Sequence, residues 1–166
     1  MSFQAPFKYL ALVLAAAGYA VAEPTRPGLT YLYSLNGTLG EPFTTGVGPH
    51  GTRAVLPVLG GPFSGPNISG QVLPIGADWG IVDSNGLFWA DARYNLRTDD
   101  GAEIFVQTSG PGQPDGTNHL RVIFETGSEK YYWMNNILAI GILTNGTTTD
   151  GTRWAALDAW QVNTSA

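Results

Sequence analysis

The stretch Leu87–Gly101 limits the fold most strongly, because its side chains alternate between two chemical types. In a β-strand, successive side chains point to opposite faces, so residues two apart share a face. The even-numbered residues from Phe88 to Leu96 form a largely apolar row, whereas the odd-numbered residues from Trp89 to Arg97 are mostly charged or carry an amide. Asp99-Asp100-Gly101 is typical of a tight turn. The pattern predicts a strand whose polar face meets either water or a polar pocket.

The rest of the chain shows the same short strands, separated by turn residues. Further strands are predicted over 29–35, 53–59, 68–73, 102–108, 119–125, 131–143 and 153–162, with a short one after Trp79. Pro57 predicts an edge or a bulge, and Gly141 predicts a bulge or bend. Asn36-Gly37 and the segment from Asn145-Gly146 to Asp150-Gly151 are predicted as turns, Gly60-Gly61-Pro62 as a strand breaker, and 41–52 as a loop.

Helical periodicity is weak throughout the chain. No window keeps a 3.6-residue apolar period over the length of a normal helix, and only one helical turn near 129–133 is considered. Many short strands at this spacing are typical of an antiparallel barrel or a sandwich. Glycine and proline at strand ends favour the barrel, since they allow the bends that close it. We therefore predict an all-β protein with a single antiparallel β-barrel of about nine or ten strands.

The N-terminus is predicted to be a secretory signal peptide covering residues 1–22. Lys8 provides the basic region, Tyr9–Ala17 the apolar run and Ala20-Val21-Ala22 the small-residue cleavage site. The apolar run is too short for a membrane anchor. Residues 23–166 are expected to form the single β-barrel domain, secreted or in the lumen of the secretory pathway, with no membrane partner after signal removal. The chain has no cysteine, so its core must hold the fold without disulfides.

Surface chemistry adds two expectations about modification and partners. Four Asn-x-Ser/Thr sequons are consistent with glycosylation in the secretory pathway, although Asn-Gly-Thr is also ordinary turn chemistry: Asn36, Asn67, Asn145 and Asn163. The chain has 13 acidic against eight basic residues, and its formal net charge is −5. An acidic chain without a basic cluster is a poor nucleic-acid partner. A small-molecule ligand is the expected partner, and a homo-oligomer is left open.

Ordered motifs along the chain match a known family. They are Arg53, Pro57, Gly60-Gly61, Ser64-Gly65-Pro66, Ser69-Gly70, Gly76-Ala77-Asp78-Trp79, Asp91-Ala92-Arg93-Tyr94, Leu96 to Ala102, Phe124-Glu125-Thr126-Gly127 and Tyr132-Trp133-Met134-Asn135. From about Leu29 to its end the chain resembles the domain of unknown function numbered 3237 (DUF 3237), a family of small β-barrels. It departs from the family pattern at Ile75 and Met134. The resemblance implies a closed or nearly closed barrel but supplies little chemistry, since fold alone does not give function.

Motifs for metal or cofactor chemistry are absent from the sequence. The chain has two histidines, His50 and His119, which are not at zinc-ligand spacing. It has no P-loop, no Gly-x-Ser-x-Gly elbow and no dinucleotide-binding glycine pattern. We therefore predict no metal and no cofactor.

The candidate site residues are polar or aromatic groups on otherwise apolar strands. Charged groups kept inside a barrel are costly unless paired, so we expect them to have a use. The predicted catalytic residues are Glu125, Asp91, Arg93 and Arg53, and the predicted ligand-binding residues are Asp78, Trp79, Trp89, Tyr132, Trp133 and Asn135. Each has a structural alternative: Asp91 and Arg93 are spaced for an ion pair, Asp78 for capping a turn, and the tryptophans for core packing.

The preferred function is a cofactor-independent isomerase, cyclase or lyase acting on an aromatic or polyketide-like secondary metabolite. In this hypothesis Glu125 or Asp91 moves the proton and Arg53 or Arg93 stabilises an oxyanion. One alternative is a secreted carrier that uses the same pocket without chemistry. The other is a carbohydrate-binding or interaction module, whose exposed aromatic surface would consist of Tyr31, Tyr33, Trp154 and Trp160.

Overall fold

A computed structural model describes residues 24–164. In this part of the chain, ten β-strands and one short 3-10 helix follow in the order β1 (Gly28–Leu39), β2 (Phe43–Gly48), β3 (Gly51–Ser64), β4 (Ser69–Asp78), β5 (Ile81–Val82), β6 (Phe88–Thr98), β7 (Glu103–Pro111), β8 (Asn118–Glu125), η1 (Tyr132–Asn136), β9 (Leu138–Thr147) and β10 (Arg153–Asn163). The predicted signal peptide lies outside the described residues. Among those described, no helix combines the length and apolar character needed to cross a membrane.

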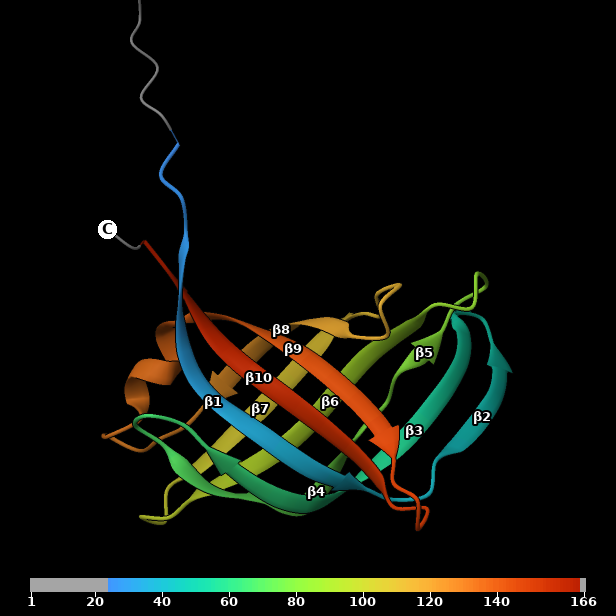
Figure 1. The fold of residues 1–166 in the computed structure, drawn as a ribbon, viewed down its shortest axis with the longest axis horizontal. Helices are drawn as coiled ribbons and strands as arrows, with labels where there is room; N and C mark the ends of the chain where they lie inside the picture. Colours follow the sequence, from blue (N-terminus) through green and yellow to red (C-terminus); the bar gives the residue numbers. More distant parts are fainter. Residues whose placement is uncertain (1–23, 165–166) are drawn as a thin grey trace, which may run out of the picture.

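Eight of the ten strands described form a closed antiparallel barrel (Figure 1). They pair in the order β1-β10-β9-β8-β7-β6-β4-β3, and β3 then pairs with β1. The two other strands extend one end of the barrel: β2 pairs with the start of β3, and β5 pairs with β3 and β6. The predicted all-β antiparallel barrel is confirmed, but the predicted strand count is too high for the ring itself because β2 and β5 lie outside it.

Several turn-prone segments lie inside strands, contrary to the prediction. Asn36-Gly37 lies within β1, Gly60-Gly61-Pro62 within β3 and Asn145-Gly146 within β9. The predicted loop 41–52 contains β2, and η1 occupies the first part of the strand predicted over 131–143. The turn-prone segments in β1, β2, β3 and β9 are extended because neighbouring strands pair with them on one or both sides, and such pairing overrides local turn preference.

Glycines let the strands approach closely where the barrel closes. Gly61 on β3 has φ +142°, and a Cβ atom there would lie 2.1 Å from the Asn36 carbonyl oxygen of β1. The β3–β4 register shifts between Pro57 and Gly61, which confirms the bulge predicted at Pro57. The bulge predicted at Gly141 is wrong, since β9 and β10 pair regularly there. Gly141 instead makes room for Leu157, whose Cδ1 atom would lie 2.6 Å from an added Cβ.

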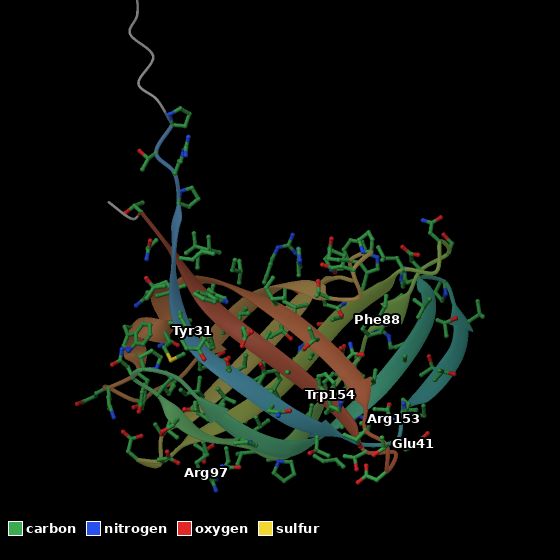
Figure 2. All side chains as sticks on the ribbon, viewed as in Figure 1. Tyr31, Glu41, Phe88, Arg97, Arg153 and Trp154 are labelled. Atoms are coloured by element: carbon green, nitrogen blue, oxygen red, sulfur yellow. The ribbon has the colours of Figure 1, made fainter. Side chains whose placement is uncertain are left out.

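The interior is filled by side chains at one end of the barrel and contains a cavity at the other. The large inward side chains with almost no exposure lie toward η1: Tyr33, Leu96, Ile104, Val106, Phe124 and Met134. Tyr33 packs edge-on against Phe63 and Phe124. Figure 2 shows the labelled Phe88, Trp154 and Arg153 at the opposite end. Toward that end, β6 contributes the alanines Ala90 and Ala92, and the lumen there remains open.

Replacing Gly61 by alanine tests the closure between β1 and β3. The new methyl group would collide with the Asn36 carbonyl and would require a backbone conformation that alanine rarely adopts. We expect Gly61→Ala to lower the free energy of unfolding by roughly 3 kcal/mol or more, measured by chemical denaturation. The matched control is Gly127→Ala, where an added Cβ meets nothing within 4 Å. Equal stability of the two variants would contradict the proposed close approach.

Candidate functional site

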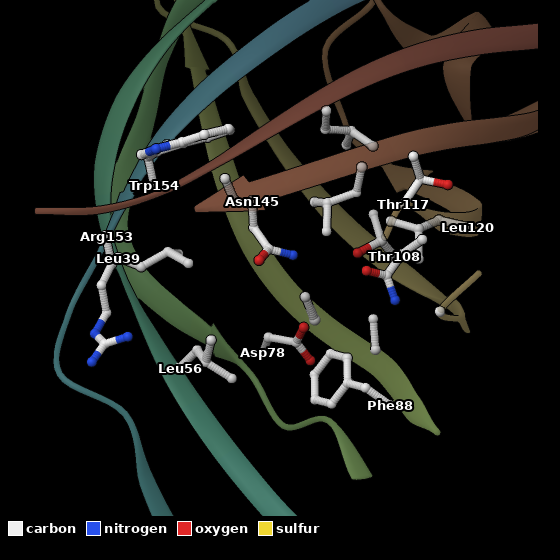
Figure 3. Close-up of a pocket in the computed structure, with 18 of the residues that line it drawn as sticks. Leu39, Leu56, Asp78, Phe88, Thr108, Thr117, Leu120, Asn145, Arg153 and Trp154 are labelled. Carbon is white, nitrogen blue, oxygen red and sulfur yellow. The ribbon is translucent and has the colours of Figure 1, made fainter. Parts of the chain in front are cut away.

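A pocket of about 510 Å³ occupies the half of the barrel away from η1. Its wall comes from the inward faces of all eight barrel strands and from residues 112–117 between β7 and β8 (Figure 3). Most lining side chains are aliphatic or aromatic. Its polar lining side chains include Asp78, Thr108, Asn118, Asn145 and Arg153. An apolar cavity of this size with a few convergent polar groups is typical of a small-molecule site.

Asp78 is placed at the wall by the pairing of β4 with β6. Asp78 is paired with Ala92, and Ala92 is in turn paired with Thr108 on β7. The three side chains therefore form one row across the wall, in which only the Ala92 methyl group separates the carboxyl group from the hydroxyl group. Figure 3 shows the Asp78 carboxyl beside the Phe88 ring, with the Asn145 amide directed toward the same space.

The environment of Asp78 makes its carboxyl group a weaker acid than usual. Burial raises the pKa of Asp78 from 3.8 to about 6, and the nearby negative charge of Asp91 adds to this effect. Hydrogen bonds from the backbone N–H groups of Asp91 and Gly80 act in the opposite direction. The Asp91 N–H lies 2.8 Å from Oδ1 of Asp78. A carboxyl group that titrates near neutrality in a cavity is suited to both giving and taking a proton.

Three further polar groups are buried in the same wall. Thr108 and Asn118 are 3% and 4% exposed. The Nδ2 atom of Asn118 has no hydrogen-bond partner among residues 24–164. The hydroxyl group of Tyr94 lies beside that of Tyr33 in the interior. Burial raises the pKa of Tyr94 far above its usual value. Tyr94 therefore stays protonated and can act only as a neutral hydrogen-bonding group.

The mouth of the pocket carries an exposed ion pair and a tryptophan. Arg153 Nε lies 3.5 Å from Glu41 Oε2, and the two side chains are 40% and 84% exposed. An ion pair this exposed contributes little to stability, so Arg153 is free to turn toward a ligand at small cost. The Trp154 ring packs on Gly146, where an added Cβ atom would lie 2.8 Å from it.

The predicted catalytic residues lie outside the pocket, so the expectation that they line the interior is wrong. Asp91 and Arg93 form an ion pair at 3.0 Å, with side chains 37% and 42% exposed. Glu125 is exposed at the end of β8. Arg53 is half-buried and donates a hydrogen bond to the Trp79 carbonyl, a structural role. For Asp91 and Arg93 the reason is the facing of β6: its even-numbered apolar row points into the barrel, so the odd-numbered charged row points out. Glu125 follows the buried Phe124 on β8 and so points to the other face.

Of the predicted ligand-binding residues, Asp78 alone lines this pocket. Trp89 is exposed and its Nε1 donates to Asp83 at 3.2 Å. Tyr132 and Trp133 are exposed on η1. Asn135 exchanges hydrogen bonds with the backbone of Thr126, at 2.8 and 2.9 Å, and thereby holds η1 against the end of β8. Trp79 is half-buried and does not line the pocket.

The proposed exposed aromatic surface does not form. Tyr33 is fully buried, and Trp154 lies at the pocket mouth. Tyr31 and Trp160 pack on each other with ring centroids 5.1 Å apart. Tyr33 and Trp154 therefore lie apart from Tyr31 and Trp160, which remain together on the outer face.

The four sequons lie in different surroundings. Asn36 and Asn67 are exposed, and Asn163 Nδ2 donates to Thr30 at 2.6 Å. Asn145 lines the pocket, so a glycan there would occupy the entrance. Their glycosylation stays a prediction.

The sequence did not identify four polar residues that line the pocket: Thr108, Asn118, Asn145 and Arg153. Asn145 was considered only as a glycosylation site. One signal was present for Asn118: it shares the inward face of β8 with Leu120, Val122 and Phe124, and a polar residue on an otherwise apolar strand face is informative. The position of Arg153 depends on how β10 pairs with β9, which local sequence does not reveal.

The fold and the pocket define this protein as a closed antiparallel β-barrel with a largely apolar internal cavity. The family described as "Protein of unknown function (DUF3237)" matches residues 27–122. The chain belongs to this family, which confirms the resemblance noted in its sequence.

Relatives of the chain include proteins with and without an assigned activity. A UPF0311 protein of Rhodopseudomonas palustris is 34% identical over 67% of this chain and 84% of its own length. The "Hydroalkoxylation enzyme phnH" of Penicillium herquei is 35% identical over 81% of this chain and 87% of its own. Among solved structures, a β-barrel-like protein of Acinetobacter baumannii has a TM-score of 0.75 at 31% identity, covering 85% of this chain and 99% of its own. An enzyme from Penicillium herquei has a TM-score of 0.68 at 32% identity, covering 86% and 98%.

The raised pKa of Asp78 predicts that this carboxyl destabilises the fold at neutral pH. Between pH 3.8 and about 6 the folded state binds more protons at Asp78 than the unfolded state does, so stability contributed by this group falls as pH rises through that range. The difference between these two pKa values corresponds to at most about 3 kcal/mol of folding stability. We expect Asp78→Asn to raise the free energy of unfolding by roughly 1–3 kcal/mol at pH 7.5 and to change it little at pH 4. Chemical denaturation at both pH values measures this; an equal effect at both would contradict the burial of the charge.

Proposed function

We propose that this protein is a cofactor-independent cyclase or isomerase, in which Asp78 carries a proton to and from a ligand inside the barrel. The observation that carries the proposal is the Asp78 carboxyl, which lines an apolar cavity and has a pKa of about 6. At neutral pH such a group is present in both protonation states. It can therefore donate a proton in one step and recover a proton in the next.

The relative that is a hydroalkoxylation enzyme supports a specific reaction class, the addition of a hydroxyl group across a carbon–carbon double bond of the same molecule. The Asp78 proton goes to one alkene carbon, the hydroxyl oxygen forms a bond with the other, and the hydroxyl proton passes to the Asp78 carboxylate. The product is an isomer of the substrate. No oxidant, reductant or second substrate is consumed, so one acid–base group and a shaped cavity are sufficient.

The cavity supports an aromatic or polyketide-like ligand of a few rings, because its wall is mostly aliphatic and aromatic and its volume is about 510 Å³. Holding the hydroxyl group and the double bond together in this space would also favour ring closure by proximity. The sequons and the expected signal peptide support a role in the secretory pathway or outside the cell, as a secondary-metabolism enzyme.

A second candidate is a carrier, which the same cavity supports without any chemistry. A carrier releases the ligand unchanged, whereas a cyclase releases an isomer. Incubation with 2-(2-methylallyl)-1-naphthol distinguishes them, since protonation of its alkene gives a tertiary cation that the phenolic oxygen traps. We expect the enzyme to form the cyclic ether, separable by chromatography at unchanged mass. Recovery of the intact naphthol from a stable complex would instead favour the carrier.

The Asp78 carboxyl group is expected to supply most of the catalytic rate enhancement. We expect Asp78→Asn to lower the rate of cyclisation by roughly a hundred- to ten-thousand-fold. If proton donation limits the rate, turnover in the wild type should decline above about pH 6, where Asp78 becomes ionised. The controls are Glu125→Gln and Arg93→Leu, both on the outer surface and expected to keep near wild-type rates. Loss of activity in these controls with retention in Asp78→Asn would contradict the assignment.

Filling the cavity tests whether the ligand binds there at all. Ala90 lines the pocket and is buried, so Ala90→Leu would place a larger side chain in the space. We expect at least a tenfold loss of affinity for 2-acetylnaphthalene, measured by fluorescence titration, with the fold retained by circular dichroism. The control is Ile123→Leu on the outer face of β8, where Ile123 is exposed. Unchanged affinity in Ala90→Leu would place the ligand elsewhere.

A further inference from the structure

We propose that the ligand carries a carboxylate group, which Arg153 binds at the mouth of the pocket in place of Glu41. This rests on the proposed function for the use of the pocket, and it adds the substrate class: an unsaturated aromatic or polyketide-like acid. The Asp78 chemistry itself requires no anionic group on the substrate.

Arg153 lies on the inward face of β10. It shares this face with Ala155 and Leu157, because side chains two residues apart point the same way from a strand. All three residues line the pocket, and Figure 3 shows the Arg153 side chain at the edge of that space. The Arg153 side chain is 40% exposed, so a ligand reaches the guanidinium without any rearrangement of the barrel wall.

The ion pair that Arg153 makes with Glu41 is long and exposed. It joins Nε to Oε2 at 3.5 Å, whereas charged N–H···O hydrogen bonds are usually roughly 2.7–2.9 Å long. The Glu41 side chain is 84% exposed, so water screens the pair and it contributes little to stability. A ligand carboxylate that accepts two parallel N–H bonds from the guanidinium makes a stronger contact, and it replaces Glu41 at small cost.

The residue paired with Arg153 on β9 provides a further donor. Arg153 pairs with Thr147, and directly opposite residues of adjacent strands have Cβ atoms roughly 4.5–5.5 Å apart. Thr147 is exposed and also lines the pocket. Its hydroxyl group can therefore add a hydrogen bond to the carboxylate that the guanidinium holds.

The charges of the pocket favour a carboxylate over a cationic group or a phosphate. Among the described lining residues, Arg153 is the one basic side chain and Asp78 the one acidic side chain. A cationic group at the mouth would meet Arg153. A phosphate dianion would bring two negative charges to a single guanidinium beside the Glu41 carboxylate. A carboxylate balances the charge of Arg153, and its two oxygens match the planar guanidinium fork.

The separation of Arg153 and Asp78 suits a ligand of a few fused rings. Leu39 of β1 pairs with both Arg153 and Val58. Leu56, two residues before Val58 on β3, pairs with Asp78. Arg153 and Asp78 are therefore three strands apart around the ring, about 14 Å along the wall at the usual strand spacing. Because both side chains point inward, a ligand held by its carboxylate at the mouth can place an alkene at Asp78.

Two ligands of the same shape and different charge test the proposal. 2-Naphthoate and 2-naphthamide differ only in that the amide has NH₂ where the acid has its second oxygen. At pH 7.5 we expect the full-length protein to bind naphthoate roughly tenfold more tightly, measured by fluorescence titration, and Arg153→Gln to remove this preference. The matched control is Arg97→Gln, which deletes the same charge from an exposed ion pair with Glu103 and should retain the preference.

Removing the competing carboxylate tests the same contact from the protein side. Glu41→Gln should raise the affinity for naphthoate by roughly two- to fivefold, because the ligand then no longer competes with Glu41 for the guanidinium. The affinity for naphthamide should stay the same. An unchanged or lower affinity for naphthoate would overturn the replacement of Glu41 by the ligand.

The Nε–H signal of Arg153 tests the contact in the wild-type protein by NMR. We expect its ¹H and ¹⁵N chemical shifts to move when naphthoate is added, because a hydrogen bond to a carboxylate deshields the proton. Binding of naphthoate that leaves this signal unmoved would overturn the proposal, even if Arg153→Gln fails to fold.

The remaining outcomes separate this inference from the proposed function. Equal affinity of the wild type for naphthoate and naphthamide, or an unchanged preference in Arg153→Gln, would overturn the role of Arg153 and leave the Asp78 reaction untouched. Tighter binding of 2-naphthyl phosphate than of naphthoate would overturn the choice of a carboxylate. Asp78→Asn should abolish cyclisation of the naphthol yet keep the preference for naphthoate. Failure of the wild type to bind either ligand would overturn the inference, whereas formation of the cyclic ether by the same protein would still support the proposed function.

Discussion

The inward-facing side chains divide the barrel interior into a packed half and a half that contains the cavity. A closed eight-stranded barrel has an interior that side chains just fill when they are large. Toward η1 they are large, and Tyr33, Leu96 and Phe124 pack there with almost no exposure. Toward the other end, Ala90 and Ala92 take the corresponding positions on β6. One half of the barrel therefore supplies the packed core that stabilises the fold, and the other half supplies the cavity.

This division explains how a costly carboxyl group is tolerated at Asp78. The packed half provides stability that does not depend on the pocket, so the pocket can hold polar groups that oppose folding. Burial raises the pKa of Asp78, which means that its ionised form destabilises the folded state. The Nδ2 atom of Asn118, which has no hydrogen-bond partner among residues 24–164, likewise lowers the stability of the folded state. Groups that lower stability but suit a ligand are typical of binding and catalytic sites.

The sequence predicted the class of fold and the faces of its central strand, but it did not predict which face points inward. The alternation over Leu87–Gly101 correctly separates an apolar row from a charged row. The charged row was expected in the interior, and this is wrong for Asp91 and Arg93, which pair on the outer surface. Barrel closure and register join residues far apart in the chain, as at Gly61 and Asn36, and local patterns carry little information about such contacts. Asp78 was found because it stands in a distinctive motif; Arg153 has no comparable signal.

The central claim is that Asp78 is a carboxyl group whose acidity is set by the apolar cavity. Its ¹³Cγ chemical shift, followed by NMR as a function of pH, measures that acidity directly. We expect a titration midpoint of about 6 in the protein alone, which moves upward when 2-isopropenylnaphthalene fills the cavity and removes more water from the carboxyl group. A midpoint near 4 that does not respond to the ligand would contradict it.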